Sequence, residues 1–372
     1  MPEDQEDEEM EFSDSTSEGD STTPEIPKEV RVLRTQAYDK SVDDLVKMVA
    51  QGDIIFDPEY QRNYLWDNRK ASLLVESILL NVPIPVIYVA EDQESRWAVV
   101  DGLQRLHSLQ RFFSNEFKLM GLEVLPELNR FQYSKLNPKA KRILNNGILR
   151  IIVILQESHP EIKYDIFLRL NRGSIKLNEQ ELRNCLYRGS FNNMLKETRK
   201  DPIFLECLAL SEPHNRFIDA ELMLRFLALY YAFDRTTGKL SGYSNRMKTF
   251  LNTFMDNQNK ASDTEIAEMK ELLLLTIRKV RTVFDPPCFR RVNVDGSFDV
   301  RLNRALMDVV MISFAYHSLE ILESHKAAIK ALYVNLPRVN SAFNDAIVYG
   351  TSDTKKIEYR ISVWNGELES LL

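Results

Sequence analysis

The sequence has few cysteines and no long hydrophobic run. Its three cysteines, Cys185, Cys207 and Cys288, lie far apart and form no Cys-x-x-Cys pair, so we predict neither a disulfide framework nor a zinc cluster. No apolar stretch approaches the roughly 20 residues that cross a bilayer. Acidic residues follow Met1 where a signal peptide would be basic and apolar. The sequence therefore predicts a reduced, cytoplasmic protein with no membrane partner.

Common metal and nucleotide motifs are also missing. The five histidines are scattered, with His317 and His325 the nearest pair, and they give no metal-ligand spacing. The chain has neither a Walker Gly-x-x-x-x-Gly-Lys-Ser/Thr loop nor a Gly-x-Gly-x-x-Gly loop after a strand. We therefore predict no metal-ligand cluster, and any nucleotide must be bound by a different device.

Acidic residues are concentrated at the start of the chain. Residues 1–29 contain twelve Asp or Glu residues and one base, Lys28, so this tail carries −11. Because the whole chain carries −7, residues 30–372 carry the difference, +4. The tail has few large apolar residues to offset the entropy of ordering, and we expect it to be disordered. It either solubilises the protein or acts as a polyanion that mimics nucleic acid or covers a basic site in the same chain.

A strand is predicted to change into a helix at Asp101–Gly102. An apolar run over 97–100 precedes this dipeptide, and apolar residues at helical spacing follow over 103–113. Glycine lets the backbone turn, and the free N–H groups of a first helical turn attract anions. Gln104 and Arg105 fall off the apolar face, so these polar groups suit a phosphorylated ligand. The alternative is structural, because Asp before a helix is a common N-cap.

A second polar segment, 56–67, mixes aromatic residues with Gln and Arg and has no clear helix or strand period. Tyr60, Gln61 and Arg62 lie in its middle, ahead of Trp66. A purely structural interpretation has the aromatic rings packing beneath a long loop while Arg62 pairs with a surface acid.

A third segment, 167–184, contains further polar candidates. They are Arg169, Asn171, Glu181 and Arg183. Helix ends explain much of this segment, because Asn178 with Glu181 makes a capping box for the second helix. Capping and pairing between helices therefore compete with ligand binding as roles for each candidate.

The three segments resemble the GmrSD restriction system N-terminal domain family. The run Asp101-Gly102-Leu103-Gln104-Arg105 is similar to the family's Asp-Gly-Gln-Gln-Arg signature, with Leu103 in place of the first Gln. Segment 56–67 resembles its Pro-x-Tyr-Gln-Arg…Trp motif, and segment 167–184 resembles its Phe-x-Arg-Leu-Asn…Leu-x-x-x-Glu-Leu-Arg-Asn motif. The likeness runs from about residue 40 to about residue 235.

The resemblance implies an α+β fold in which a ParB/sulfiredoxin-like nucleotide-binding domain occupies residues 30–190. Beyond it the pattern turns helical, and we expect an all-α domain over residues 191–372. The resemblance also implies that two Gln–Arg pairs face one pocket. Its catalytic residues would be Asp101, Gln104 and Arg105, and its nucleotide-binding residues Tyr60, Gln61, Arg62, Gly102, Arg169, Asn171, Glu181 and Arg183.

The implied function is nucleotide binding with NTP hydrolysis in a DNA restriction or phage-defence system. The ligand would be a nucleoside triphosphate with a divalent cation such as Mg²⁺. Full restriction enzymes of the family add a His-Asn-His nuclease domain, and the histidines past residue 235 lack the neighbours that such a site requires. We therefore expect no DNA cleavage by this chain alone, and DNA and a separate nuclease subunit are the expected partners.

Two other functions stay open. The chain could be a non-hydrolytic sensor or adaptor that binds a nucleotide or DNA while its helical half engages a partner. It could also be a DNA-binding module like ParB, although the modest +4 of residues 30–372 counts against that function.

Overall fold

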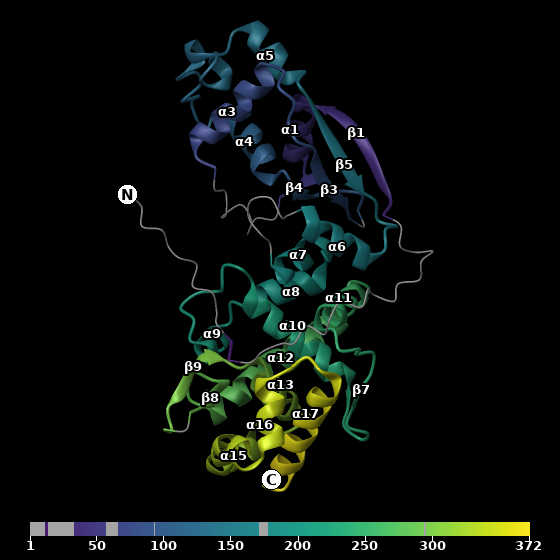
Figure 1. Cartoon of the computed structure of the whole chain (residues 1–372), viewed down its shortest axis with the longest axis vertical. Helices are drawn as coiled ribbons and strands as arrows, with labels where there is room; N and C mark the ends of the chain where they lie inside the picture. The colour runs from purple at the N-terminus through teal and green to yellow at the C-terminus, as the bar shows by residue number, and fades with distance from the viewer. Residues whose placement is uncertain (1–11, 14–32, 57–65, 93, 171–177, 294) are drawn as a thin grey trace. The chain divides into compact units, whose positions relative to one another are not determined.

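The computed structural model describes residues 12–13, 33–56, 66–92, 94–170, 178–293 and 295–372 (Figure 1). The chain divides into two compact units, which we call the α/β unit (Glu25–Leu177) and the helical unit (Met1–Pro24 with Asn178–Leu372). The division lies before the boundary predicted near residue 190. It lies earlier because helix α7 (Glu179–Leu186) packs on helices of the second unit.

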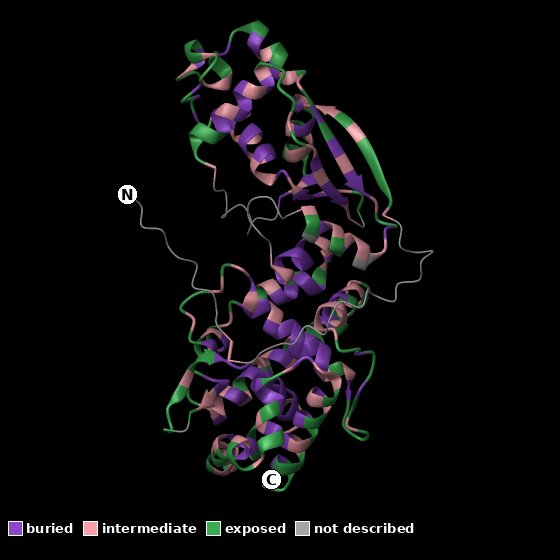
Figure 2. Cartoon of the chain, in the orientation of Figure 1, coloured by how far each residue is buried: buried purple, intermediate pink, exposed green. Residues whose placement is uncertain are grey.

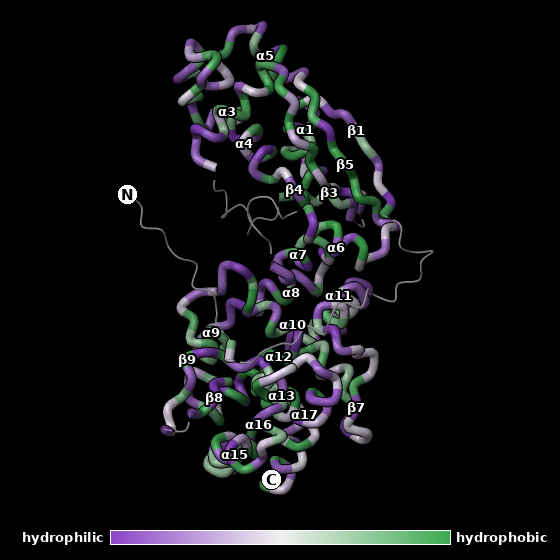
Figure 3. Tube along the Cα trace, in the orientation of Figure 1, coloured by the Kyte–Doolittle hydropathy of each residue, from purple (hydrophilic) through white to green (hydrophobic). Residues whose placement is uncertain are grey.

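The α/β unit is built on a five-stranded mixed sheet. The strands are β1 (Thr35–Ser41), β2 (Ile54–Ile55), β3 (Ile87–Glu91), β4 (Trp97–Asp101) and β5 (Ile148–Ile154), in the order β1-β5-β3-β4-β2. β3 runs parallel to β5 and antiparallel to β4. The alternating residues Leu149, Ile151 and Val153 of β5 are almost fully buried, and Figure 3 shows this strand as a hydrophobic stretch. The sheet therefore contributes one face to the core of the unit.

Helices complete this unit. They are α1 (Val42–Gln51), α3 (Asn68–Leu79), α4 (Leu103–Phe113), α5 (Pro138–Asn145) and α6 (Pro160–Leu170), with the 3-10 turns η2 (Pro126–Leu128) and η3 (Tyr133–Lys135). The side chains of Ser41, Asp67 and Asn137 accept N–H bonds at the starts of α1, α3 and α5, so each of these helices begins at a side-chain cap. Apolar side chains of α1, α3, α4 and the sheet share one core.

The second unit is mostly helical, so the chain has the predicted α+β organisation. Besides α7, its helices are α8 (Ser190–Thr198), α9 (Pro202–Leu208), α10 (Ile218–Ala232), α11 (Met247–Gln258), α12 (Asp263–Val283), α13 (Arg304–Ala315), α14 (Leu319–Ser324), α15 (Lys326–Val339), α16 (Ser341–Val348) and α17 (Thr354–Glu369). They surround a core of their own, seen as buried residues along α10 and α13 (Figure 2).

Two features of the helical unit differ from the prediction. It contains the hairpins β6 (Phe233–Asp234) with β7 (Lys239–Leu240) and β8 (Arg290–Val292) with β9 (Phe298–Leu302), so it is not entirely α-helical. The helical pattern over 302–322 is also interrupted. Leu302 ends a strand, and Ser318 accepts the N–H of Ile321 and starts a new helix.

A buried ion cluster links three helices of this unit. Asp308 on α13 accepts hydrogen bonds from Arg225 on α10, with both distances 2.7 Å, and from Arg360 on α17, also at 2.7 Å. All three side chains are at most 5% exposed. Because a buried charge without a partner is costly, this cluster fixes how α10, α13 and α17 meet.

Three observations concern the cysteines, groups of metal-ligand type and helix hydrophobicity in the described residues. Cys185, Cys207 and Cys288 are buried and free, with no disulfide. Within the described ranges no group of His, Cys, Asp and Glu has the geometry of a metal site. No helix in that same part of the chain has the length and apolar character needed to cross a membrane.

The acidic tail contains two described residues, Phe12 and Ser13. Phe12 forms a parallel β-bridge with Leu302, the last residue of β9. We expected all of residues 1–29 to be disordered, and the ordered contact at Phe12 differs from that expectation.

A buried carboxylate fixes the loop that follows α4. Glu76 on α3 is 4% exposed and accepts the backbone N–H groups of Glu123, Val124 and Leu125 at 3.2, 2.8 and 2.8 Å. Burial alone would raise the pKa of Glu76, but the three N–H donors outweigh it and the pKa is lowered. The carboxylate therefore stays ionised inside the unit.

We predict that Glu76→Ala lowers the free energy of unfolding at pH 7 by about 1.5–3 kcal/mol, the range for hydrogen bonds to a charged group. Urea denaturation measures this loss, and Glu127→Ala, an exposed site, is the matched control. Because the pKa of Glu76 is lowered on folding, its contribution is present above the pKa of the unfolded chain and disappears as the pH falls through the folded-state pKa. Equal stabilities of the two variants at pH 7 would contradict this role.

Candidate functional site

The strand-to-helix turn at Asp101–Gly102 is formed as predicted. Asp101 ends β4, Gly102 follows with φ +98°, and Leu103 begins α4. A Cβ atom at Gly102 would lie 2.8 Å from Cγ1 of Ile87 and 3.2 Å from Nη2 of Arg105. Both the left-handed backbone and the close approach of β3 therefore require glycine here.

Asp101 is not the N-cap of α4. The N-cap residue is Gly102, which makes no side-chain hydrogen bond to the first turn. Oδ2 of Asp101 instead accepts a hydrogen bond from Nη2 of Arg105 at 2.8 Å, while the Asp101 side chain stays 41% exposed. The capping interpretation is thus wrong, and an oriented, partly exposed carboxylate lies beside the start of α4.

Arg105 is buried, contrary to the expectation that it lies off the apolar face. Its side chain is 11% exposed. Besides Asp101, its guanidinium donates to the carbonyl oxygens of Pro85 and, at 3.4 Å, of Val86. These carbonyls replace water around a charge that could not otherwise be buried. Arg105 therefore ties three parts together: the end of β4, the first turn of α4 and the chain that leads into β3.

The segment that contains Tyr60, Gln61 and Arg62 lies outside the described residues, but both of its ends contact α4. Before it, the ring of Phe56 meets the ring of His107 edge-on, with centroids 5.9 Å apart. After it, the backbone N–H of Trp66 donates to Oε1 of Gln104 at 3.3 Å. Gln104 thus faces the second motif.

His107 lies on α4 and makes the first of these two contacts. Burial and the nearby positive charge of Arg111 lower its pKa, against the smaller opposing effect of Glu116. The imidazole is therefore held neutral at pH 7.

The first part of the third motif lies on α6 in the α/β unit. Arg169 pairs with Asp165 one turn earlier at 2.7 Å, and both side chains are more than half exposed. Asn171 lies outside the described residues. Arg169 is therefore a surface ion pair, which contributes little to stability and leaves its guanidinium accessible to solvent.

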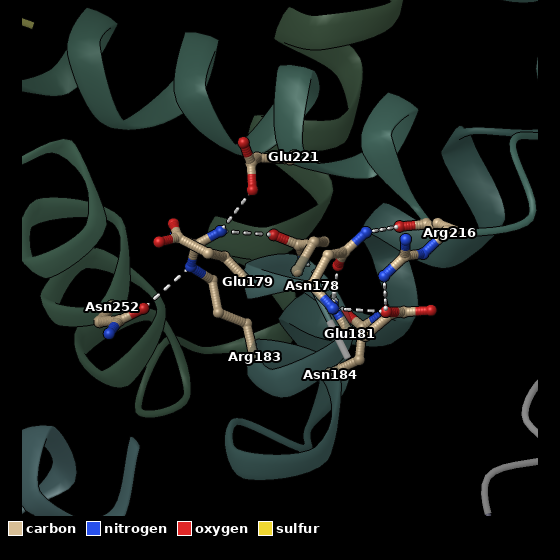
Figure 4. A network of polar contacts seen from close by, with 9 residues as sticks. Asn178, Glu179, Glu181, Arg183, Asn184, Arg216, Glu221 and Asn252 are labelled. Carbon is tan, nitrogen blue, oxygen red and sulfur yellow. Dashed lines mark hydrogen bonds and ion pairs between the residues drawn. The ribbon is translucent and has the colours of Figure 1, made fainter. Parts of the chain in front are cut away.

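The second part of the third motif lies in the helical unit (Figure 4). Arg183 on α7 is fully buried and donates to Glu179 at 3.0 Å, Glu221 on α10 at 2.8 Å and Asn252 on α11 at 2.8 Å. Two carboxylates thus neutralise its charge. Arg183 joins α7 to α10 and α11.

Glu181 serves the same helix as a cap. Its carboxylate accepts the N–H of Asn178 at 2.6 Å, and Oδ1 of Asn178 accepts the N–H of Glu181 at 2.8 Å, so the predicted capping box is confirmed. The same carboxylate lies 3.3 Å from Nη2 of Arg216. For Glu181 and Arg183, these contacts account for the side chains without a ligand.

Sequence reasoning missed the partners of the motif residues. The helical i,i+4 rule did not indicate the Asp101–Arg105 pair, because Asp101 ends β4 and lies outside α4. No sequence pattern predicts that Arg105 bonds to the carbonyls of Pro85 and Val86 or that Phe56 contacts His107. Those contacts depend on how β3 and α4 pack.

Comparison with known families finds a family model that matches part of the chain. The family model described as GmrSD restriction endonuclease, N-terminal domain, matches residues 42–188. This stretch is therefore similar to that family, and the match supports a role in a restriction or phage-defence system. No curated protein and no solved structure matches the chain.

We predict that Arg105→Ala lowers the free energy of unfolding by about 1.5–3 kcal/mol, because Asp101 and two carbonyls lose a charged donor. Chemical denaturation measures the change, and the exposed Arg142 on α5 supplies the control: Arg142→Ala should stay within about 0.5 kcal/mol of the parent. Similar losses in both variants would show that Arg105 does not hold the turn.

We also predict a pH effect from His107. Its folded-state pKa lies below the unfolded value, so the unfolded chain binds more protons and stability falls as the pH drops through and below the unfolded-state pKa of about 6.5. His107→Phe keeps an aromatic ring against Phe56 and removes this titration. Between pH 7.5 and 5.5 the variant should lose less stability than the parent, and parallel pH profiles would contradict the assignment.

Proposed function

We propose that the α/β unit binds a nucleoside triphosphate, together with Mg²⁺, at the Asp101–Gly102 turn, as a component of a DNA restriction or phage-defence system. The observation that carries this proposal is the arrangement of the turn itself. An N-terminus with no side-chain cap, on the eleven-residue helix α4, lies next to a carboxylate that Arg105 holds in one orientation.

Each part of the turn has a chemical role in this proposal. The backbone N–H groups at the start of α4 donate to phosphate oxygens, and the helix dipole favours their negative charge. The absence of a Cβ at Gly102 makes room for Ile87 and Arg105, which lets the chain turn directly from β4 into α4. The Asp101 carboxylate would otherwise repel phosphate, so its role is to orient a bound divalent cation or a water molecule.

The second Gln–Arg pair supplies positive charge and base contacts. Phe56 and Trp66 contact His107 and Gln104 on α4, which supports placing Tyr60, Gln61 and Arg62 in the same site. In this arrangement Arg62 binds phosphate oxygens, and Gln61 with Gln104 positions the base or water.

One observation favours a second candidate, a sensor that binds nucleotide without hydrolysing it. The guanidinium of Arg105 already bonds to Asp101, Pro85 and Val86. Hydrolysis requires positive charge near the developing phosphate charge, so Arg62 would have to provide it. If Arg62 only binds the ground state, the chain would pass nucleotide or DNA signals to a separate nuclease subunit.

We predict that Arg62→Ala weakens binding of a nucleoside triphosphate by about 1.5–3 kcal/mol, the range for a hydrogen bond to a charged group. The unfolding free energy should stay close to that of the parent. Isothermal titration with each of the four common ribonucleoside triphosphates in the presence of Mg²⁺ measures binding, and Arg142→Ala is the matched control. If Arg62→Ala and Arg142→Ala bind alike, the site is not at this turn.

Phosphate release by the parent, with and without DNA, separates hydrolysis from sensing. Asp101→Asn keeps an oxygen that can accept from Arg105 but removes the charge that orients cation or water. A hydrolase should therefore lose turnover in this variant more than it loses binding. A sensor would show nucleotide binding and no phosphate release in either protein.

A further inference from the structure

A contact of the acidic tail lies within the helical unit. The described residues of the acidic tail, Phe12 and Ser13, run alongside the end of β9. Phe12 bridges Leu302 in parallel, and the N–H of Ser13 donates to the carbonyl oxygen of Leu302 at 2.9 Å. The tail therefore pairs with the last residue of β9 through an isolated bridge.

The side chains make specific contacts as well. The ring of Phe12 packs against the core of the helical unit, and the guanidinium of Arg304 lies 4.1 Å from the centre of this ring. Asn303 donates to Oγ of Ser13 at 3.2 Å. An apolar contact, a cation–π contact and a side-chain hydrogen bond thus hold two adjacent residues.

The groups that receive Phe12 and Ser13 are themselves fixed. Asn303 is fully buried, donates to the carbonyl of Ile347 at 2.8 Å and accepts the N–H of Leu306 at 2.8 Å. Its amide is therefore oriented by its own helix, α13, and by α16. Because the Asn303 side chain is already ordered, less conformational entropy is lost when a segment binds to it.

β9 has the character of a docking edge. Its partner β8 pairs with it through Arg290–Leu302 and Val292–Phe298. Phe298 is 55% exposed and Val300 is 89% exposed, and an edge strand with exposed apolar side chains is a template for an added strand.

We propose that the β9 edge, with Asn303 and Arg304, is a binding site for a short acidic segment centred on an aromatic residue, and that the chain's own N-terminal segment occupies it. Residues 1–24 contain ten Asp or Glu residues and no Lys or Arg, which complements Arg304. The main-chain bonds supply affinity, and Phe12 supplies specificity, as in other strand additions. Of the two tail functions weighed from the sequence, this selects the cover of a basic site in the same chain.

The site is independent of the nucleotide proposal, because all its residues belong to the helical unit. Because the internal segment belongs to the same chain, its binding is intramolecular and is governed by an effective concentration. A free peptide of the same sequence must therefore compete with the internal segment in the parent chain, and it meets less competition once the Phe12 side chain is removed.

The test uses a fluorescent peptide of residues 5–18 and three full-length proteins: the parent, Phe12→Ala and the control Phe131→Ala, which changes a partly exposed phenylalanine of the α/β unit. Fluorescence anisotropy should show that Phe12→Ala binds the peptide at least about tenfold more tightly than the parent, because the internal competitor is weakened. Phe131→Ala should behave like the parent. Adding Arg304→Ala to Phe12→Ala should reduce peptide binding several-fold.

Two results would overturn the proposal. In the first, the peptide binds the parent and Phe12→Ala with equal affinity, or binds neither protein. The other is equal binding of a peptide in which Phe12 is replaced by alanine, which would show adsorption by charge alone. Hydrogen exchange gives a second readout: the amide of Ser13 should exchange slowly in the parent and fast in Phe12→Ala, and equal rates would also refute the docking.

Discussion

The buried guanidinium of Arg105 is the interaction on which the α/β unit's candidate site depends. It bonds to Asp101 at the end of β4 and to the carbonyls of Pro85 and Val86 before β3. A charge can be buried at this depth only if its donors are satisfied. The same bonds therefore stabilise the turn, keep the Asp101 carboxylate in one orientation and leave the start of α4 without a side-chain cap.

The helical unit uses buried arginines in a comparable way. Arg183 joins α7 to α10 and α11, and Asp308 joins Arg225 to Arg360. Such pairs contribute mainly to specificity of packing, because the cost of removing both charges from water offsets much of their attraction. The motif residues Arg105 and Arg183 thus each stabilise the packing of their own unit. A position in a motif therefore does not by itself distinguish a ligand contact from a structural one.

The charge distribution acquires a structural meaning from the tail contact. The described part of the acidic tail, Phe12 and Ser13, contacts the end of β9, and Phe12 also contacts Arg304. Net charge sets long-range attraction, but a fixed contact needs an apolar anchor and main-chain bonds. Phe12 and Ser13 provide both, whereas the sum of charges could not indicate where the tail docks.

The sequence alone determined the local features of this protein. Apolar spacing and the Asp-Gly dipeptide predicted the β4–α4 turn, and Asn178 with Glu181 predicted a capping box, because these depend on residues within one turn of each other. The motif residues likewise predicted the family to which residues 42–188 are similar. Only the tertiary structure decided that Arg105 is buried, that Arg183 is neutralised by two carboxylates and that Phe12 pairs with Leu302. Those contacts join segments distant in sequence, and their partners follow from how sheets and helices pack rather than from any local pattern.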